Sequence, residues 1–139
     1  MSKVAVIQES PVFLNREETI NKAIAYIEQA ASAGAQLIVF PEAYISAYPA
    51  WIWRLRPGGD WGLSEELHTR LLENAVDIDA GNLQPLCDAA KDNAVTIVCG
   101  MNEIDGKLSK ATLYNTVVII DDKGNIINRH RKLMPTNPE

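Results

Sequence analysis

A carboxylate, Glu42, stands directly after a short apolar segment in the sequence Val-Phe-Pro-Glu-Ala. Residues 35–40 are typical of a buried strand, and Pro41 has no N–H with which to continue a sheet ladder. We therefore expect Glu42 at the carboxyl end of a strand, where α/β folds gather their binding and catalytic groups. A carboxylate at that edge can take a proton from a nucleophile, which makes Glu42 a candidate general base.

A second polar cluster, His-Arg-Lys-Leu-Met-Pro-Thr at 130–136, follows the last predicted strand. Lys132 precedes two apolar residues, and near Glu42 it would act as a fixed cation for an anionic transition state or as a proton carrier. His130 is a candidate for orienting that lysine. The competing interpretation is a solvated basic strand end, and residue type alone favours it.

The sequence contains two cysteines, Cys87 and Cys99. Neither belongs to a Cys-x-x-Cys motif or to a Cys/His cluster with metal-ligand spacing. Cys87 falls in an apolar helical pattern and Cys99 in a β-branched segment, so we interpret both as buried structural residues. The sequence therefore predicts neither a disulfide framework nor a metal site.

The composition is that of one globular domain spanning residues 1–139, with 47% hydrophobic and 22% charged residues. A net charge of -5 argues against a nucleic-acid partner. No apolar stretch approaches the length of about 20 residues that spans a bilayer, and the first residues lead directly into a strand. We expect a cytoplasmic protein with no membrane or nucleic-acid partner.

The first elements predict a strand-helix-strand unit. Residues 3–8 are β-branched, Asn15 with Glu18 is a helix-entry pattern, and apolar residues then recur at helical spacing until Gly34. Strands joined in this way form a right-handed parallel pair, so the first strand (3–8) and the second (35–40) should end at the same edge.

Further along, residues 44–62 read as an aromatic loop with about one helical turn. One helix is predicted to begin at Ser64, and a further helix is predicted to be capped by Asn82 and to end near Asn93. Residues 95–99 and 112–120 are predicted strands, and the turn 121–125 should join the latter to 126–130 as a hairpin. His68 falls on a charged helix face, and Asn102 and Glu103 follow a strand end as candidate supporting groups.

Two motifs together resemble the signature of the nitrilase superfamily of carbon-nitrogen hydrolases. They are Phe-Pro-Glu-Ala-Tyr at 40–44, with Tyr48 and Pro49 downstream, and His-Arg-Lys-Leu-Met-Pro-Thr at 130–136. The aromatic segment 48–53 and the Lys-Leu-Met-Pro-Thr form resemble the nitrilase branch. The resemblance covers the whole chain and implies the amino-terminal half of an α-β-β-α sandwich, with one mixed sheet and helices on one face.

The resemblance also implies a Glu-Lys-Cys triad in which Glu42 is the general base and Lys132 stabilises the tetrahedral intermediate. Glu139 resembles the additional active-site glutamate of many members, and Tyr48 and Trp53 are candidate substrate-binding residues. For the tryptophan loop, lid packing and a pocket wall are equally favoured. The family nucleophile lies beyond the lysine, so the domain is expected to be incomplete at its carboxyl end; the family chemistry uses no metal or organic cofactor.

The expected reaction is hydrolysis of a nitrile to a carboxylic acid and ammonia. The alternatives are an amidase or carbamoylase with the same triad, and a non-catalytic half that pairs with a second polypeptide. Half of a two-sheet sandwich leaves an apolar sheet face uncovered, so we expect a homo-oligomer or pairing with the remaining half.

Overall fold

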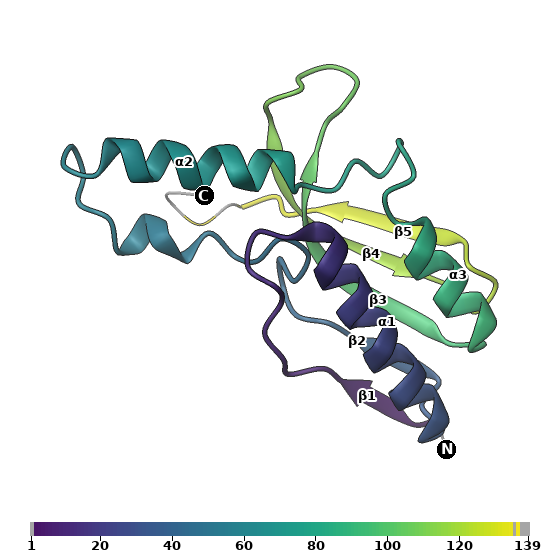
Figure 1. Cartoon of the computed structure of the whole chain (residues 1–139). Coiled ribbons are helices and arrows are strands. Elements are labelled where there is room, and N and C mark those ends of the chain that lie inside the picture. Colours follow the sequence, from purple (N-terminus) through teal and green to yellow (C-terminus); the bar gives the residue numbers. More distant parts are fainter. Residues whose placement is uncertain (1, 135, 137–139) are drawn as a thin grey trace.

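The computed structural model describes residues 2–134 and 136. In chain order the elements are β1 (Val4–Val6), α1 (Arg16–Ser32), β2 (Leu37–Val39), the 3-10 helix η1 (Ala50–Trp53), α2 (Trp61–Glu73), α3 (Gln84–Asp92), β3 (Thr96–Ile104), β4 (Leu113–Ile120) and β5 (Ile126–Arg131). The strands form one five-stranded sheet in the order β1-β2-β3-β4-β5 (Figure 1). Strands β1, β2 and β3 are parallel, whereas β4 and β5 join by antiparallel pairing. The predicted α/β class with one mixed sheet is confirmed.

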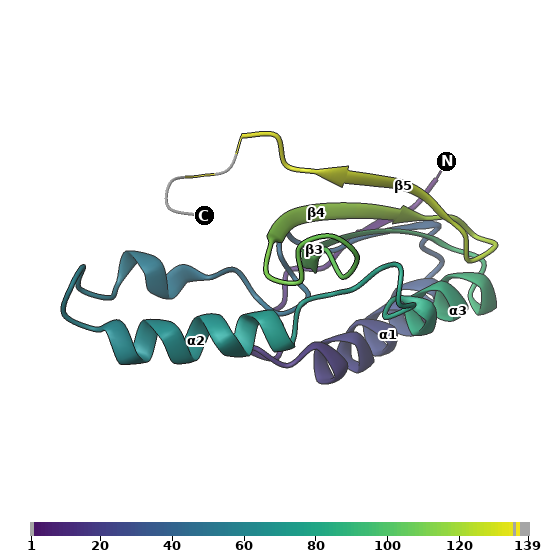
Figure 2. The ribbon, with the colours of Figure 1, turned by 90° about the horizontal axis from the view of Figure 1, so that it is seen from above.

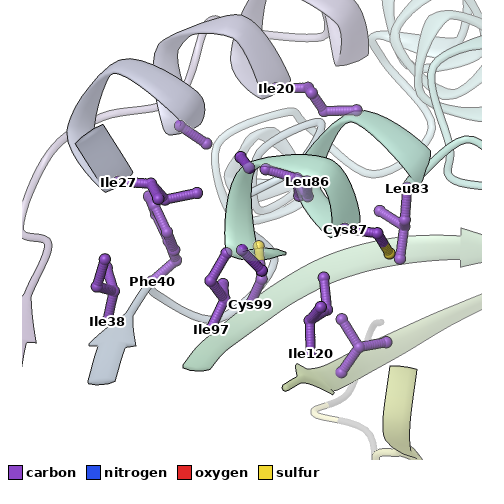
Figure 3. Close-up of a cluster of buried hydrophobic side chains, with 14 of the residues drawn as sticks. Ile20, Ile27, Ile38, Phe40, Leu83, Leu86, Cys87, Ile97, Cys99 and Ile120 are labelled. Carbon is purple, nitrogen blue, oxygen red and sulfur yellow. The ribbon is translucent and has the colours of Figure 1, made fainter. Parts of the chain in front are cut away.

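Helices α1 and α3 pack on the same face of the sheet (Figures 1 and 2). The side-chain oxygen of Asn15 accepts a hydrogen bond from the Glu18 N–H, which caps α1 as predicted. Apolar side chains of both helices meet the inner face of the sheet in a single core, shown in Figure 3. That core includes Ile27, Ile38, Leu86, Ile97 and Ile120, all fully buried.

No helix in the described part of the chain covers the opposite face of the sheet (Figure 2). Val4 is 51% exposed and Val6 is 73% exposed, both on β1. Because side chains alternate along a strand, Val98, Val117 and Ile119 point away from the buried residues between them and are only partly buried. The predicted uncovered apolar face is therefore present in the described structure.

Several element boundaries differ from the predictions. Helix α2 begins at Trp61, three residues before Ser64, because the Asp60 carbonyl already accepts a hydrogen bond from the Ser64 N–H. Helix α3 begins at Gln84, since the Asn82 side chain accepts from the Asp77 N–H instead of capping the helix. Strand β3 continues to Ile104, well past the predicted end at Cys99.

Strands β4 and β5 form the predicted hairpin, in which Thr116 pairs with Arg131. The turn 121–125 closes with a hydrogen bond from the Asp121 N–H to the Asn125 carbonyl, and Gly124 adopts a φ of 81°. A β-bulge lies between Ile119 and Ile120. No helix in the described residues is long and apolar enough to cross a bilayer.

Candidate active site at the carboxyl ends of β2 and β5

Glu42 lies on a backbone kink that interrupts the extended chain after β2. The Phe40 N–H still bonds to Val98 and the Ile45 N–H bonds to Gly100, but Pro41 cannot donate and Ala43 adopts a φ of 48°. Gly100 of β3 makes room for this kink, because an added Cβ would lie 2.4 Å from the Pro41 carbonyl oxygen and 2.8 Å from the Glu42 Cα. The kink buries Phe40 and Tyr44 while it leaves the Glu42 side chain 55% exposed.

The structure brings Glu42 and Lys132 together. The Lys132 Nζ lies 2.9 Å from the Glu42 Oε1 and 3.3 Å from the Thr136 Oγ1. The Asn115 side-chain amide donates to the same Glu42 oxygen at 2.7 Å, and the Asn115 carbonyl accepts from the Lys132 N–H at 2.8 Å. A carboxylate, an ammonium group and an amide thus form one cluster.

The sheet topology explains this convergence. Strand β5 is antiparallel to β4, which is antiparallel to β3, so β5 runs in the same direction as β2 and β3. The carboxyl ends of β2 and β5 therefore lie at the same edge, which is where Glu42 and Lys132 follow their strands.

Asn102 holds the segment that follows Glu42. Its side-chain amide donates to the Ala47 carbonyl at 2.8 Å, and its N–H donates to the Ile45 carbonyl at 3.2 Å. Ser46 and Ala47 adopt φ values of 78° and 73°, a left-handed conformation that needs such support. This backbone path leads directly to Tyr48.

Tyr48 lines a cavity of about 240 Å³. Its walls are mainly apolar and aromatic, with a few polar side chains, and consist of Tyr48, Pro49, Trp51, Ile52, Ser64, His68, Leu71, Asn102, Leu113, Tyr114 and Asn115. Asn115 connects this cavity to the Glu42 carboxylate, because the residue lines the cavity and its side chain donates to Glu42. The cavity is suited to an uncharged molecule with an apolar or aromatic group.

Other candidate residues lie in different places. Trp53 is 54% exposed and is not part of the cavity lining, which Trp51 and Ile52 of the same 3-10 helix supply. His68 is exposed, as expected of its charged helix face, and contributes to the cavity rim. Glu139 lies outside the described residues.

Glu103 forms a buried ionic cluster beside the site. It is fully buried, and it accepts hydrogen bonds from Thr116 at 2.8 Å and from the guanidinium groups of Arg129 and Arg131. Burial acts to raise the Glu103 pKa, but the two guanidiniums and the hydroxyl outweigh it and hold the pKa below its usual range. The Arg131 guanidinium also stacks 3.7 Å from the Tyr114 ring centroid, which ties the cluster to a cavity wall.

Both cysteines belong to the core between the helices and the sheet (Figure 3). Cys87 is 5% exposed and Cys99 is completely buried. Burial raises the pKa of Cys87, and it raises the pKa of Cys99 to about 12. Neither thiol therefore has the thiolate character of a nucleophile. Within residues 2–134 and 136, no three His, Cys, Asp or Glu side chains are grouped so that they could hold a metal ion.

Sequence reasoning did not identify Asn115 as a site residue. An asparagine in the middle of a β-branched segment is a signal that could have revealed it, because asparagine is depleted in strands. Its contacts with Glu42 and Lys132 depend on strand pairing, which the sequence pattern does not specify.

Comparison with known proteins identifies relatives that match nearly the whole length of this chain. An arylacetonitrilase of Aspergillus niger is 41% identical over 137 residues, which are 99% of this chain and 38% of the relative. An aliphatic nitrilase of Rhodococcus rhodochrous is 37% identical, and a cyanide hydratase of Microdochium sorghi is 36% identical, over 99% of this chain in both cases. The chain spans 36% and 35% of the lengths of these two relatives.

Solved structures share the fold. The NitFhit protein of C. elegans superimposes with a TM-score of 0.73 and 18% identity, over 100% of this chain and 30% of that protein. An amidase from Nesterenkonia sp. superimposes with a TM-score of 0.68 and 19% identity, over 99% of this chain and 44% of the amidase. The family model of carbon-nitrogen hydrolases matches residues 3–139, and the chain therefore belongs to the carbon-nitrogen hydrolase family.

Proposed function

We propose that this chain supplies the general base and the lysine of a nitrilase, which hydrolyses a nitrile to a carboxylic acid and ammonia. The observation that carries the proposal is the 2.9 Å contact between the Glu42 Oε1 and the Lys132 Nζ at one sheet edge. The nitrilase relatives, at 41% and 37% identity, support this substrate class.

In the proposed reaction, Glu42 takes the proton of a cysteine thiol, and the thiolate attacks the nitrile carbon. Negative charge then develops on the nitrile nitrogen, where the Lys132 ammonium stabilises it or donates a proton. Water adds to the thioimidate, ammonia leaves, and water hydrolyses the resulting acyl-enzyme. The nucleophilic cysteine is proposed to come from outside these 139 residues, and Glu139 to assist Glu42 and Lys132.

Tyr48 is proposed to contact the substrate, since it lines the 240 Å³ cavity beside Asn115. The aromatic and apolar walls favour an uncharged arylaliphatic nitrile. The proposal that Trp53 contacts the substrate rests only on the sequence motif, because Trp53 is not part of the cavity lining. No metal or organic cofactor is part of the proposed mechanism.

The uncovered sheet face supports a proposal about assembly. Its partly exposed valine and isoleucine side chains favour contact with the remainder of the enzyme or with a second copy of the chain. Light scattering of the 139-residue protein at micromolar concentration tests this proposal. We expect a species larger than the monomer, and a clean monomer would contradict it.

Product analysis with the full-length enzyme tests the activity. Phenylacetonitrile and its matched amide, phenylacetamide, are each incubated with the wild type and with Glu42→Gln, and acid, amide and ammonia are quantified. Phenylacetic acid and ammonia from the nitrile, lost in the variant, are expected. Turnover of the amide alone would instead support an amidase, and the amide as sole product from the nitrile would support a hydratase.

A further inference from the structure

We propose that Asn115 is the positioning residue of the Glu42 and Lys132 pair. Its side-chain amide orients the Glu42 carboxylate, and its carbonyl fixes the start of the lysine segment. The inference rests on the proposed function, because it assigns Asn115 a role in orienting the proposed general base.

The first support is that one residue contacts both partners. The Asn115 Nδ2 lies 2.7 Å from the Glu42 Oε1, and the Asn115 carbonyl accepts the Lys132 N–H at 2.8 Å. The amide orientation follows from chemistry, since a carboxylate only accepts hydrogen bonds and the nitrogen of Asn115 must therefore face it. The amide and the ammonium converge on the same oxygen, Oε1.

The second support is that the ion pair alone would hold its geometry only weakly. The Glu42 side chain is 55% exposed and the Lys132 side chain 31% exposed, and pairs of this kind hold their geometry weakly in water. Lysine also has a flexible stem of four methylene groups. Asparagine is short and neutral, so Asn115 restrains the carboxylate without changing the charge of the cluster.

The third support is that the backbone of Asn115 is itself held firmly. It belongs to β4, which pairs with β3 on one side and β5 on the other, and it lies opposite Asn102. Its neighbour Thr116 donates to buried Glu103, and its other neighbour Tyr114 stacks against Arg131. A group on such a scaffold keeps its direction, as pre-organised catalysis requires.

A spectroscopic experiment tests the contact in the 139-residue protein without any activity. The side-chain amide resonance of Asn115 is assigned by its loss in Asn115→Ala and followed in proton-nitrogen spectra as pH is varied. We expect it to shift as Glu42 ionises and to lose this response in Glu42→Gln. The Asn93 amide, which donates to the Ala89 carbonyl, is the internal control and should behave alike in both proteins.

A kinetic experiment tests the role in the full-length enzyme with phenylacetonitrile. Asn115→Asp keeps the size of the side chain but places a carboxylate against Glu42, and Asn115→Ala removes the donor. We expect both variants to lower kcat by about 100-fold, the effect of misplacing a reacting group by about 1 Å, while KM changes much less. Asn128→Ala, an exposed asparagine of β5, is the matched control and should leave both constants unchanged.

The outcomes separate the two proposals. Turnover that is abolished by Glu42→Gln but unaffected in Asn115→Asp would overturn the role of Asn115 alone. An Asn115 amide resonance that does not shift when Glu42 ionises would also overturn the role of Asn115. Absence of turnover in the full-length wild type would overturn the proposed function and, with it, the role of Asn115, even where the spectra confirm the contact.

Discussion

The Oε1 atom of Glu42 lies 2.9 Å from the Nζ atom of Lys132, although 90 positions separate the two residues in the sequence. The contact joins a kink after β2 to the end of β5, and Asn115 touches both partners. The cluster is therefore a product of sheet pairing, and its geometry is sensitive to changes in the strands that carry it.

A protein made of residues 1–139 alone should not hydrolyse nitriles. Both of its cysteines are buried, and burial raises the pKa of each thiol, so neither supplies a thiolate at neutral pH. Ammonia release from phenylacetonitrile is the measurement, with the full-length enzyme as the positive control. Turnover by the short protein that Glu42→Gln abolishes would point to Cys87, Cys99 or a nucleophile from elsewhere.

The two thiols should also resist labelling in the folded protein. Cys99 is fully buried and has its pKa raised to about 12, and Cys87 is 5% exposed. We expect iodoacetamide at pH 8 to modify neither residue under native conditions and both in 6 M guanidinium, as measured by mass spectrometry. Rapid native modification of Cys99 would show that the core around it opens readily.

Replacing Glu103 with glutamine should destabilise the fold. The change removes a buried carboxylate that accepts hydrogen bonds from Thr116, Arg129 and Arg131. The two arginine side chains keep 31% and 35% exposure, so we expect a loss of about 3 kcal/mol, the low end for a broken buried pair. Urea unfolding measures this loss in the free energy of unfolding. Glu66→Gln, at an exposed position, is the control and should change the free energy of unfolding by no more than about 0.5 kcal/mol.

The same carboxylate makes stability depend on pH. Its pKa is lower in the folded protein than in the unfolded chain, so its stabilising contribution is present above the unfolded value of about 4.3 and disappears as pH falls through the folded pKa. The stability difference between wild type and Glu103→Gln should therefore be constant from pH 7 to pH 5 and shrink in more acidic buffer. A difference that grows on acidification would contradict this assignment.

Gly100→Ala should displace the Glu42 segment. The new methyl group would lie 2.4 Å from the Pro41 carbonyl oxygen and 2.8 Å from the Ala43 nitrogen, so backbone must move. We expect a loss of about 1 to 3 kcal/mol in urea unfolding, together with a weakened response of the Asn115 amide to Glu42. Gly62→Ala in α2, where an added Cβ meets nothing within 4 Å, should be neutral or slightly stabilising.

The sequence predicted the parts of the fold that depend on local patterns. Asn15 and the apolar spacing after it predicted α1, the β-branched segments predicted β1 to β5, and the two motifs predicted Glu42 and Lys132 as a pair. These features are local, or they are carried by a family resemblance. The uncovered sheet face was predicted from the family resemblance, since half of a two-sheet sandwich leaves one apolar face of its sheet uncovered.

Other features could not be predicted because they arise from contacts between distant segments. In the sequence Gly100 is an ordinary strand glycine, and only the structure shows that the Pro41 backbone packs against it. Asn82 looks like a helix cap, but its side chain is already engaged by the Asp77 N–H. The start of α2 was predicted at Ser64 because serine followed by Glu65 and Glu66 is typical of a helix start, whereas the backbone is already helical from Trp61.

The turn 121–125 lies at the far end of the β4-β5 hairpin from Asn115 and Lys132. Its hydrogen bonds and the bulge between Ile119 and Ile120 decide which residue of β5 stands opposite each residue of β4. Shifting that pairing by one residue would reverse the faces to which the β5 side chains point. Deleting one residue from this turn would carry Lys132 away from Glu42, so the direction in which Lys132 points is determined by a loop that lies outside the Glu42 and Lys132 cluster.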